Sequence, residues 1–227
     1  PRTEWISYCD RVKEAYPIVR PEYREETNAA NTYCLVETIA EKMNKDDIYV
    51  AGSSGSCIDI SMQTFCVKRG QRVFCTKGLA SMGYGLPSTI GACLAGNKAK
   101  TVSVQGDGGF VMNIQELETI HRLNLPIKIF VLRNKGYGAI KATQTNIFAG
   151  HLVACDETSG LSLPEIGKVA EAYGLHTEKI LSNAELDEKV QAVLDYDGPV
   201  ICEVFTPMGL TASPKQVSYK RSDGQME

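Results

Sequence analysis

Short apolar runs alternate along the chain with longer stretches in which apolar residues recur at helical spacing. The run 127–132 is strongly β-branched, which favours a buried strand. Four further runs predict strands and the stretches between them predict helices: strands at 48–51, 72–75, 101–105 and 199–204, and helices at 31–43, 56–67, 89–95, 113–123, 164–174 and 182–195. This alternation predicts an α/β fold, a three-layer α/β/α domain with a mainly parallel sheet.

Individual residues mark several helix boundaries. Pro164 is expected to open one helix and Gly174 to end it. Ser182 followed by Glu185 matches a capping box, which predicts the start of a helix that runs to about residue 195. The stretch 89–95 is small and apolar all round and predicts a buried helix.

The two ends of the chain differ from its middle. Residues 1–28 are polar with scattered aromatic residues, and we expect a linker or lead-in arm there. Residues 29–207 are expected to form one domain, and residues 208–227 a C-terminal tail. Because the chain begins with Pro1 and not with an initiator Met, we expect a processed or cut piece of a longer chain. The tail is expected to be truncated.

Composition narrows the classes of partner. The 227 residues are 43% hydrophobic and 22% charged, with a net charge of −3 and no long basic run. These values argue against nucleic acid or a membrane as the partner. An anionic ligand must then be bound by backbone N–H groups, a helix N-terminus or a metal. The eight cysteines form no C-x-x-C pair, so we expect buried thiols in a reducing cytoplasm.

Polar and glycine-rich segments follow the predicted strands, where an open parallel sheet binds its ligands. Asp107 comes after the strand 101–105 and Asn134 after the strand 127–132, 27 positions apart, so both are expected at neighbouring strand tips. Mg²⁺ prefers oxygen ligands and often takes phosphates among them. Gly106 and Gly108 allow close backbone approach, and a helix from about Asn113 is expected to aim its N–H groups at the same place. The residues therefore predict a Mg²⁺–diphosphate site.

Two segments carry a resemblance to a known family. Gly106-Asp107-Gly108 followed by Leu132-Arg133-Asn134 resembles the GDG…NN motif of thiamine diphosphate (ThDP) enzymes, and residues 78–92, GLASMGYGLPSTIGA, resemble the segment ahead of that site. From about Trp5 to about Pro207 the chain is similar to the last domain of acetolactate synthase and its relatives, the domain that binds the cofactor diphosphate.

The resemblance implies roles for individual residues. Asp107, the Asn134 side chain and the Gly136 carbonyl would bind Mg²⁺, and Met82 would hold ThDP bent. The backbone around Ala80 would face the aminopyrimidine. The remaining cofactor-binding residues would be Gly55, Ser56, Gly106, Gly108, Gly109 and Tyr137. From the residues alone, Met82 could instead fill the core, Gly55 and Ser56 could start a helix, and Tyr137 could lie on the surface.

The sequence also departs from the family pattern. Arg133 replaces the first Asn of the motif, Ala80 a usual Gly, and Thr143-Gln144 a Trp-Gln pair. Since that Trp lies near the substrate pocket of acetolactate synthases, its absence weakens an assignment of pyruvate as the substrate. Metal and cofactor binding are unaffected.

The resemblance implies a ThDP-dependent 2-oxo acid carboligase or decarboxylase, in a homo-oligomer. The Glu that activates the cofactor is expected on a pyrimidine-binding domain of the same or a neighbouring chain. No catalytic residue is therefore expected here, and the isolated chain should be inactive. The alternative is a non-catalytic or separate-subunit ThDP-binding module.

Other enzyme classes lack their motifs. A dinucleotide-binding dehydrogenase would need a third glycine after Gly83-Tyr84-Gly85, where Ser88 stands. No G-x-S-x-G elbow of a hydrolase is present. The three histidines, His121, His151 and His176, are expected to be surface or packing residues.

Overall fold

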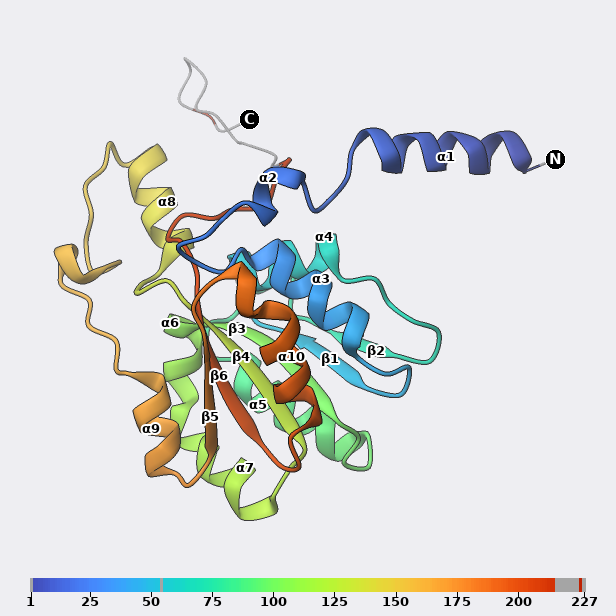
Figure 1. Ribbon diagram of the computed structural model, residues 1–227. Coiled ribbons are helices and arrows are strands. Elements are labelled where there is room, and N and C mark those ends of the chain that lie inside the picture. The colour runs from blue at the N-terminus through green and yellow to red at the C-terminus, as the bar shows by residue number, and fades with distance from the viewer. Residues whose placement is uncertain (1, 54, 215–224, 226–227) are drawn as a thin grey trace.

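Six parallel strands form the centre of the computed structural model, which describes residues 2–53, 55–214 and 225 (Figure 1). Each strand pairs with its neighbours in parallel. In sheet order the strands are β2 (Arg72–Phe74), β1 (Ile48–Ala51), β3 (Thr101–Gly106), β4 (Ile127–Arg133), β6 (Val200–Phe205) and β5 (His176–Ile180). Five of them match the predicted runs within two residues.

Helices cover both faces of the sheet, which confirms the predicted three-layer α/β/α architecture (Figure 1). One face packs against α3 (Thr32–Lys42), α4 (Ser56–Thr64) and α10 (Leu186–Asp195). The other packs against α5 (Gly85–Ala95), α6 (Asp107–Phe110), α7 (Leu117–Leu123) and α9 (Ile166–Ala172). In β4, Phe130 and Leu132 belong to the first core and Ile129 and Val131 to the second, so the strand is apolar at consecutive positions.

Four elements were not predicted. Strand β5 reads His-Thr-Glu-Lys-Ile, too polar for a buried strand, because it lies at the edge of the sheet. Helices α1 (Thr3–Ala15) and α2 (Pro21–Arg24) lie within the expected arm; α1 has no buried residue and projects from the sheet (Figure 1). Helix α8 (Gly138–Ile147) also has no buried residue.

Some predicted helix details were wrong. The helix after β3 starts at Asp107 rather than near Asn113; α6 continues through a 3₁₀ turn, η1 (Val111–Glu116), in which Asn113 breaks the helical backbone. Helix α5 is not buried all round, since Leu94 is 45% exposed. The residues on its outer face are also mostly small or apolar, so the sequence did not reveal which side of the helix packs against the sheet.

The predicted capping box is also wrong. Among the described residues, the Ser182 side chain caps no N–H group. Instead, the Glu185 carboxylate accepts a 2.7 Å hydrogen bond from the Leu181 N–H, and a 3₁₀ turn, η3 (Asn183–Glu185), precedes α10. The helix expected from Pro164 begins at Ile166, two residues later.

The strand order places a crevice between β1 and β3. From β1 the chain moves to β2 on one side and then to β3 on the other. Helix α4 after β1 and helix α6 after β3 consequently leave toward opposite faces of the sheet. Ligands of open α/β sheets bind at such a switch point, beyond the carboxyl ends of the strands. Within the described residues, every helix is too short or too polar to cross a membrane.

Candidate functional site

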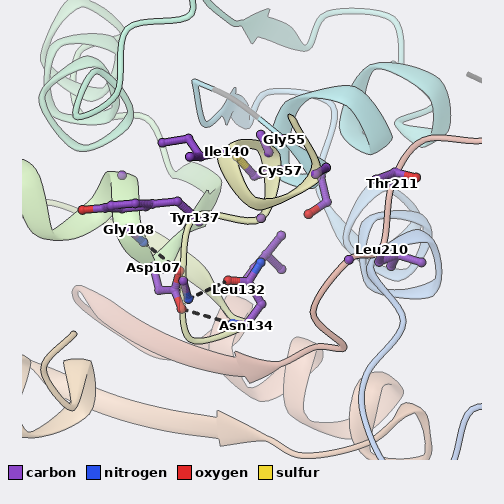
Figure 2. Close-up of a pocket in the computed structure, with 18 of the residues that line it drawn as sticks. Gly55, Cys57, Asp107, Gly108, Leu132, Asn134, Tyr137, Ile140, Leu210 and Thr211 are labelled. Carbon is purple, nitrogen blue, oxygen red and sulfur yellow. Dashed lines mark hydrogen bonds between the residues drawn. The ribbon is translucent and has the colours of Figure 1, made fainter. Parts of the chain in front are cut away.

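A pocket of about 130 Å³ opens at this switch point (Figure 2). The loops after β1, β2, β3 and β4 line it together with the start of α8 and residues 209–211. Ten of the predicted site residues lie around it: Gly55, Ser56, Met82, Gly106, Asp107, Gly108, Gly109, Asn134, Gly136 and Tyr137. Ala80 lies outside the set of lining residues.

Asp107 is the buried acid of the pocket, with 2% of its surface exposed. Its Oδ1 accepts a 2.7 Å hydrogen bond from the Gly108 N–H, and its Oδ2 accepts a 3.1 Å bond from the Asn134 N–H (Figure 2). Oδ2 also accepts a 2.8 Å bond from the Lys135 N–H. These bonds tie the start of α6 to the loop after β4. Because Gly106 and Leu132 pair directly in the sheet, the two loops leave it side by side.

Oxygen atoms converge beside Asp107. The end of the Asn134 amide lies 3.1 Å from Asp107 Oδ1 and 2.8 Å from the Gly136 carbonyl oxygen. With the amide oxygen turned inward, three oxygens face one another; with the nitrogen turned inward, it donates a hydrogen bond to each of the other two. Adjacent ligands of octahedral Mg²⁺ lie about 2.9 Å apart, as follows from metal–oxygen distances of about 2.0–2.1 Å. The Asn134 amide oxygen thus lies at a spacing from each of the other two oxygens that suits a Mg²⁺ ion.

Burial raises the pKa of Asp107 to about 6, although the N–H groups of Gly108, Lys135 and Asn134 act in the opposite direction. The carboxylate is therefore costly in its charged form when no cation is near. A divalent cation beside Oδ1 would offset that cost. Because the site has one carboxylate, phosphate groups can supply the remaining metal ligands and the remaining negative charge.

Two glycines of the pocket are needed for different reasons, Gly108 for close packing and Gly55 for its backbone conformation. A Cβ atom on Gly108 would run into the Tyr137 ring, which lies over Gly108 (Figure 2). Tyr137 is partly buried and lines the pocket, so the structure favours a pocket residue over a surface residue at this position. Gly55 has φ of +62° and immediately precedes α4, so it and Ser56 both start a helix and line the pocket.

The loop that carries Met82 is fastened to the turn after α6. Asn113 Nδ2 donates a 2.8 Å hydrogen bond to the Gly83 carbonyl, at the point where Asn113 leaves helical geometry. Met82 is partly buried and lines the pocket. Ala80 has φ of +51°, a left-handed conformation that glycine adopts more easily, which accounts for the usual glycine at this place in the family it resembles.

Two departures from the family pattern have structural explanations. Arg133 lies outside the set of lining residues; its Nη1 donates a 2.6 Å bond to the buried Glu203, and its guanidinium lies over the Phe205 ring. The second departure, Thr143, donates its hydroxyl to the Ala139 carbonyl at 3.0 Å within α8. Its neighbour Gln144, which matches the family pattern, binds the Val153 backbone twice, accepting from its N–H at 3.0 Å and donating to its carbonyl at 3.1 Å. These side chains thus hold the framework around the pocket.

Sequence reasoning missed several lining residues. Cys57 and Asp59 lie on α4, Ile140 on α8, and Leu210 and Thr211 on the segment after β6 (Figure 2). Ile140 follows Tyr137 by one helical turn, a signal that needed α8 to be recognised. Residues 210 and 211 fall in the expected tail, most of which, 215–224 and 226–227, lies outside the described residues.

The histidines lie away from the pocket. His121 and His151 are exposed, and the His176 ring stacks on Tyr196 with 4.2 Å between the ring centroids. Among the described residues that line the pocket, none is a histidine. A histidine base for a hydrolase reaction is therefore not found in this pocket.

The fold and the site together indicate a thiamine pyrophosphate enzyme domain. Residues 54–204 match the model of the family described as thiamine pyrophosphate enzyme, C-terminal TPP binding domain, and the chain belongs to this family. It is a ThDP-binding domain of the acetolactate synthase-like kind.

Particular relatives agree with this assignment. The chain is similar to the acetolactate synthase large subunit of Pyropia yezoensis, at 31% identity over 222 residues that cover 98% of this chain and 36% of that protein. It is also similar to chloroplastic acetolactate synthase 2 of Zea mays, at 26% identity over 211 residues that cover 89% of this chain and 32% of that protein. The chain thus spans about a third of the length of these relatives.

A solved structure shares the fold. The Rhodococcus jostii RHA1 thiamine diphosphate-dependent 4-hydroxybenzoylformate decarboxylase superposes with a TM-score of 0.69 at 22% identity, over 80% of this chain and 33% of that one. The six-stranded parallel sheet with helices on both faces is therefore the fold of a known ThDP enzyme domain.

Proposed function

We propose that the domain binds Mg²⁺ and, through it, the diphosphate of ThDP. The protein ligands of the metal are Asp107 Oδ1, the Asn134 amide oxygen and the Gly136 carbonyl oxygen. The observation that carries the proposal is the convergence of these three oxygens at 2.8 and 3.1 Å beside a buried carboxylate. The diphosphate oxygens and water complete the coordination.

The remaining pocket residues are assigned to the cofactor. Backbone groups of the two glycine-rich loops contact the diphosphate: those of Gly55, Ser56, Gly106, Gly108 and Gly109. Met82 supports the bend of the cofactor, the backbone near Ala80 faces the aminopyrimidine, and Tyr137 packs beside the diphosphate. The proposal is supported by the position of all these residues except Ala80 around one pocket.

The size of the pocket supports a half-site. Ligand pockets usually measure about 300–1,000 Å³, whereas this one measures about 130 Å³. A pyrimidine-binding domain of the same or a neighbouring chain is proposed to cover the rest and to supply the activating Glu. The relatives, about three times as long, have room for such a domain.

The whole protein is proposed to be a 2-oxo acid carboligase or decarboxylase that works as a homo-oligomer in the cytoplasm. Bound ThDP supplies a nucleophilic carbon and an electron sink for the 2-oxo acid. This chain anchors the diphosphate and orients the cofactor, and Ile140 and Leu210 contribute apolar surface to the pocket. The second candidate is a separate-subunit or non-catalytic ThDP-binding module; the absence of a suitable Glu among the described lining residues favours it equally.

Calorimetric titration of ThDP into the protein, with Mg²⁺ and then with EDTA, tests the proposal. Binding should require Mg²⁺ and should disappear in Asp107→Ala, while Asp47→Ala, which removes a buried carboxylate elsewhere, should still bind. Circular dichroism shows whether each variant is folded. If the wild type fails to bind even with a pyrimidine-binding domain of a relative added in trans, the ThDP assignment is wrong.

A further inference from the structure

The Gly136 carbonyl is the least constrained of the three converging oxygens, because it belongs to an irregular loop. The preceding residue, Lys135, has φ of +62°, so the chain turns sharply there. Asp107 and Asn134, in contrast, lie directly at the ends of β3 and β4. The Gly138 N–H donates a 3.2 Å bond to the Gly136 carbonyl from within the loop, and contacts from elsewhere hold the rest of the residue at its place.

A distant segment supplies these contacts. Gly136 forms an isolated antiparallel bridge with Asp156, and the Tyr137 N–H donates a 2.8 Å bond to the Cys155 carbonyl. A Cβ atom on Gly136 would run into that same carbonyl and would lie 3.2 Å from the Met208 Cε. The backbone of Gly136 is thus pressed between residues 155–156 and Met208.

Asp156 organises this segment. Its carboxylate is buried, with 4% of the residue exposed. Oδ1 caps the 3₁₀ turn η2 (Glu157–Ser159), accepting from the Thr158 hydroxyl at 2.7 Å, from the Ser159 hydroxyl at 2.8 Å and from the Ser159 N–H at 3.0 Å. Oδ2 accepts a 2.6 Å bond from Lys141 Nζ.

Lys141 connects the turn back to the site. It lies on α8, which begins two residues after Gly136 and whose first turn lines the pocket. Lys141 Nζ also lies 3.4 Å from the Met208 sulfur, so it links both segments that press on Gly136. The Lys141 ammonium and the hydroxyl groups hold the pKa of Asp156 well below its usual range, so the ion pair persists in acid.

We propose that Asp156 is a positioning residue which, through its ion pair with Lys141, fixes the Gly136 carbonyl at the spacing that Mg²⁺ requires and thereby selects Mg²⁺ over Ca²⁺. The inference rests on the proposed function. Mg²⁺ demands near-octahedral oxygens at about 2.0–2.1 Å, whereas Ca²⁺ accepts about 2.3–2.6 Å and irregular geometry. A carbonyl released from its clamp can still serve Ca²⁺ but serves Mg²⁺ poorly.

The variant Asp156→Asn tests the proposal in the full chain. The amide oxygen keeps the cap of η2, while the amide nitrogen faces the Lys141 ammonium and breaks the 2.6 Å bond. ThDP is titrated with saturating Mg²⁺ and, separately, with saturating Ca²⁺. We expect the affinity with Mg²⁺ to fall about 10–100-fold, as for other residues that orient metal ligands, and the affinity with Ca²⁺ to change less than about threefold.

Two further variants make the result specific. Lys141→Gln, at a half-exposed position on α8, should shift the Mg²⁺ to Ca²⁺ ratio the same way, and it carries the test if Asp156→Asn does not fold. Glu185→Gln is the matched control, because Glu185 also pairs with a lysine, Lys189 at 2.9 Å, and accepts a backbone N–H; it should leave the ratio unchanged.

The outcomes separate the two proposals. An equal loss of affinity with both metals, or no loss, would overturn the inference, because Asp156 would then act on stability alone or not at all. If the wild type binds ThDP equally well with and without either metal, the proposed Mg²⁺ site itself is refuted. If Asp156→Asn and Lys141→Gln both lose ThDP affinity with Mg²⁺ but not with Ca²⁺, the Mg²⁺ site and the role of Asp156 are both supported.

Discussion

Replacing Asp107 with asparagine is expected to stabilise the metal-free protein, although it removes the proposed metal ligand. The carboxyl is buried, and burial raises its pKa to about 6 from an ordinary value of 3.8. In the absence of a cation, the ionised group therefore lowers the free energy of unfolding. Asparagine has nearly the same shape without the charge.

The size of the effect follows from the contacts. A pKa difference of about two units corresponds to about 3 kcal/mol at a pH where the carboxyl is ionised in both states. The asparagine oxygen can take the place of Oδ2 and keep the bonds from the Asn134 and Lys135 N–H groups. The raised pKa already includes the bond from the Gly108 N–H, and the new amide can donate to Asn134. The expected net gain is therefore about 2–3 kcal/mol.

The gain should depend on pH in a defined direction. Because the folded pKa is raised, the unfolded carboxyl ionises first, and the wild type loses stability as pH rises from about 4 to above 6. Below pH 4 both states are protonated, so the advantage of Asp107→Asn should vanish. Above pH 7 it should be constant.

Urea unfolding in EDTA at pH 4.5 and pH 8 measures both quantities. The matched control is Asp47→Asn, since the buried Asp47 accepts the Asn44 N–H at 2.7 Å and lies 3.6 Å from Lys100 Nζ. That variant should lose stability. With Mg²⁺ and ThDP present, the wild type should gain stability and Asp107→Asn should not.

One result would refute the reasoning: an Asp107→Asn variant that is less stable than the wild type at pH 8 in EDTA. The carboxylate would then stabilise the metal-free loop through its N–H bonds, and burial would not be the dominant influence on its pKa. A gain that does not change with pH would point to packing rather than ionisation.

Three further predictions concern single residues. Gly108→Ala should lower the free energy of unfolding by about 1–3 kcal/mol, because its methyl group meets the Tyr137 ring, whereas the methyl group of Gly106→Ala meets no described atom within 4 Å and should change that free energy by less than about 1 kcal/mol. Urea unfolding compares the two variants, and equal effects would contradict the packing argument. Asn134→Ala should weaken Mg²⁺-dependent ThDP binding at least about tenfold in calorimetry while the fold persists, and unchanged binding would exclude Asn134 as a ligand. Burial lowers the pKa of Lys128 to about 8, so the charged amine lowers stability at neutral pH. The free energy of unfolding of the wild type, relative to that of Lys128→Met, should therefore rise by about 2 kcal/mol between pH 7.5 and pH 10. A difference that stays flat or falls would show that the amine stays charged.

The chain pattern anticipated the centre of the sheet and the pairing of Asp107 with Asn134. Strand β4 is apolar at nearly every position because both of its faces are covered, and such a run is visible without knowing its neighbours. The spacing of Asp107 and Asn134 accommodates one helix and one strand, which places the two at adjacent strand ends in a parallel sheet. The apolar run of β4 is a local feature, and the position of Asp107 beside Asn134 follows from the single crossover that joins β3 to β4.

Elements that lack a buried apolar face escaped sequence reasoning. Strand β5 gains its stability from pairing with β6 along the sheet edge, and backbone hydrogen bonds carry no residue signal. Helix α8 buries no residue, so packing against the core does not mark its position in the sequence. The turn at Ala80 uses a left-handed conformation at a non-glycine residue, which composition does not indicate.

Sequence alone thus predicted the fold class and five of the six strands, because hydrophobic burial leaves a periodic trace in the chain, and it placed Asp107 and Asn134 at neighbouring strand ends. Only the tertiary structure brought Arg133 to Glu203, 70 residues away, and Asp156 to Gly136 and Lys141. It also placed Leu210 and Thr211 on the pocket wall. Such contacts join side chains and carbonyls from separate loops, and their geometry follows from how the layers pack rather than from any local pattern.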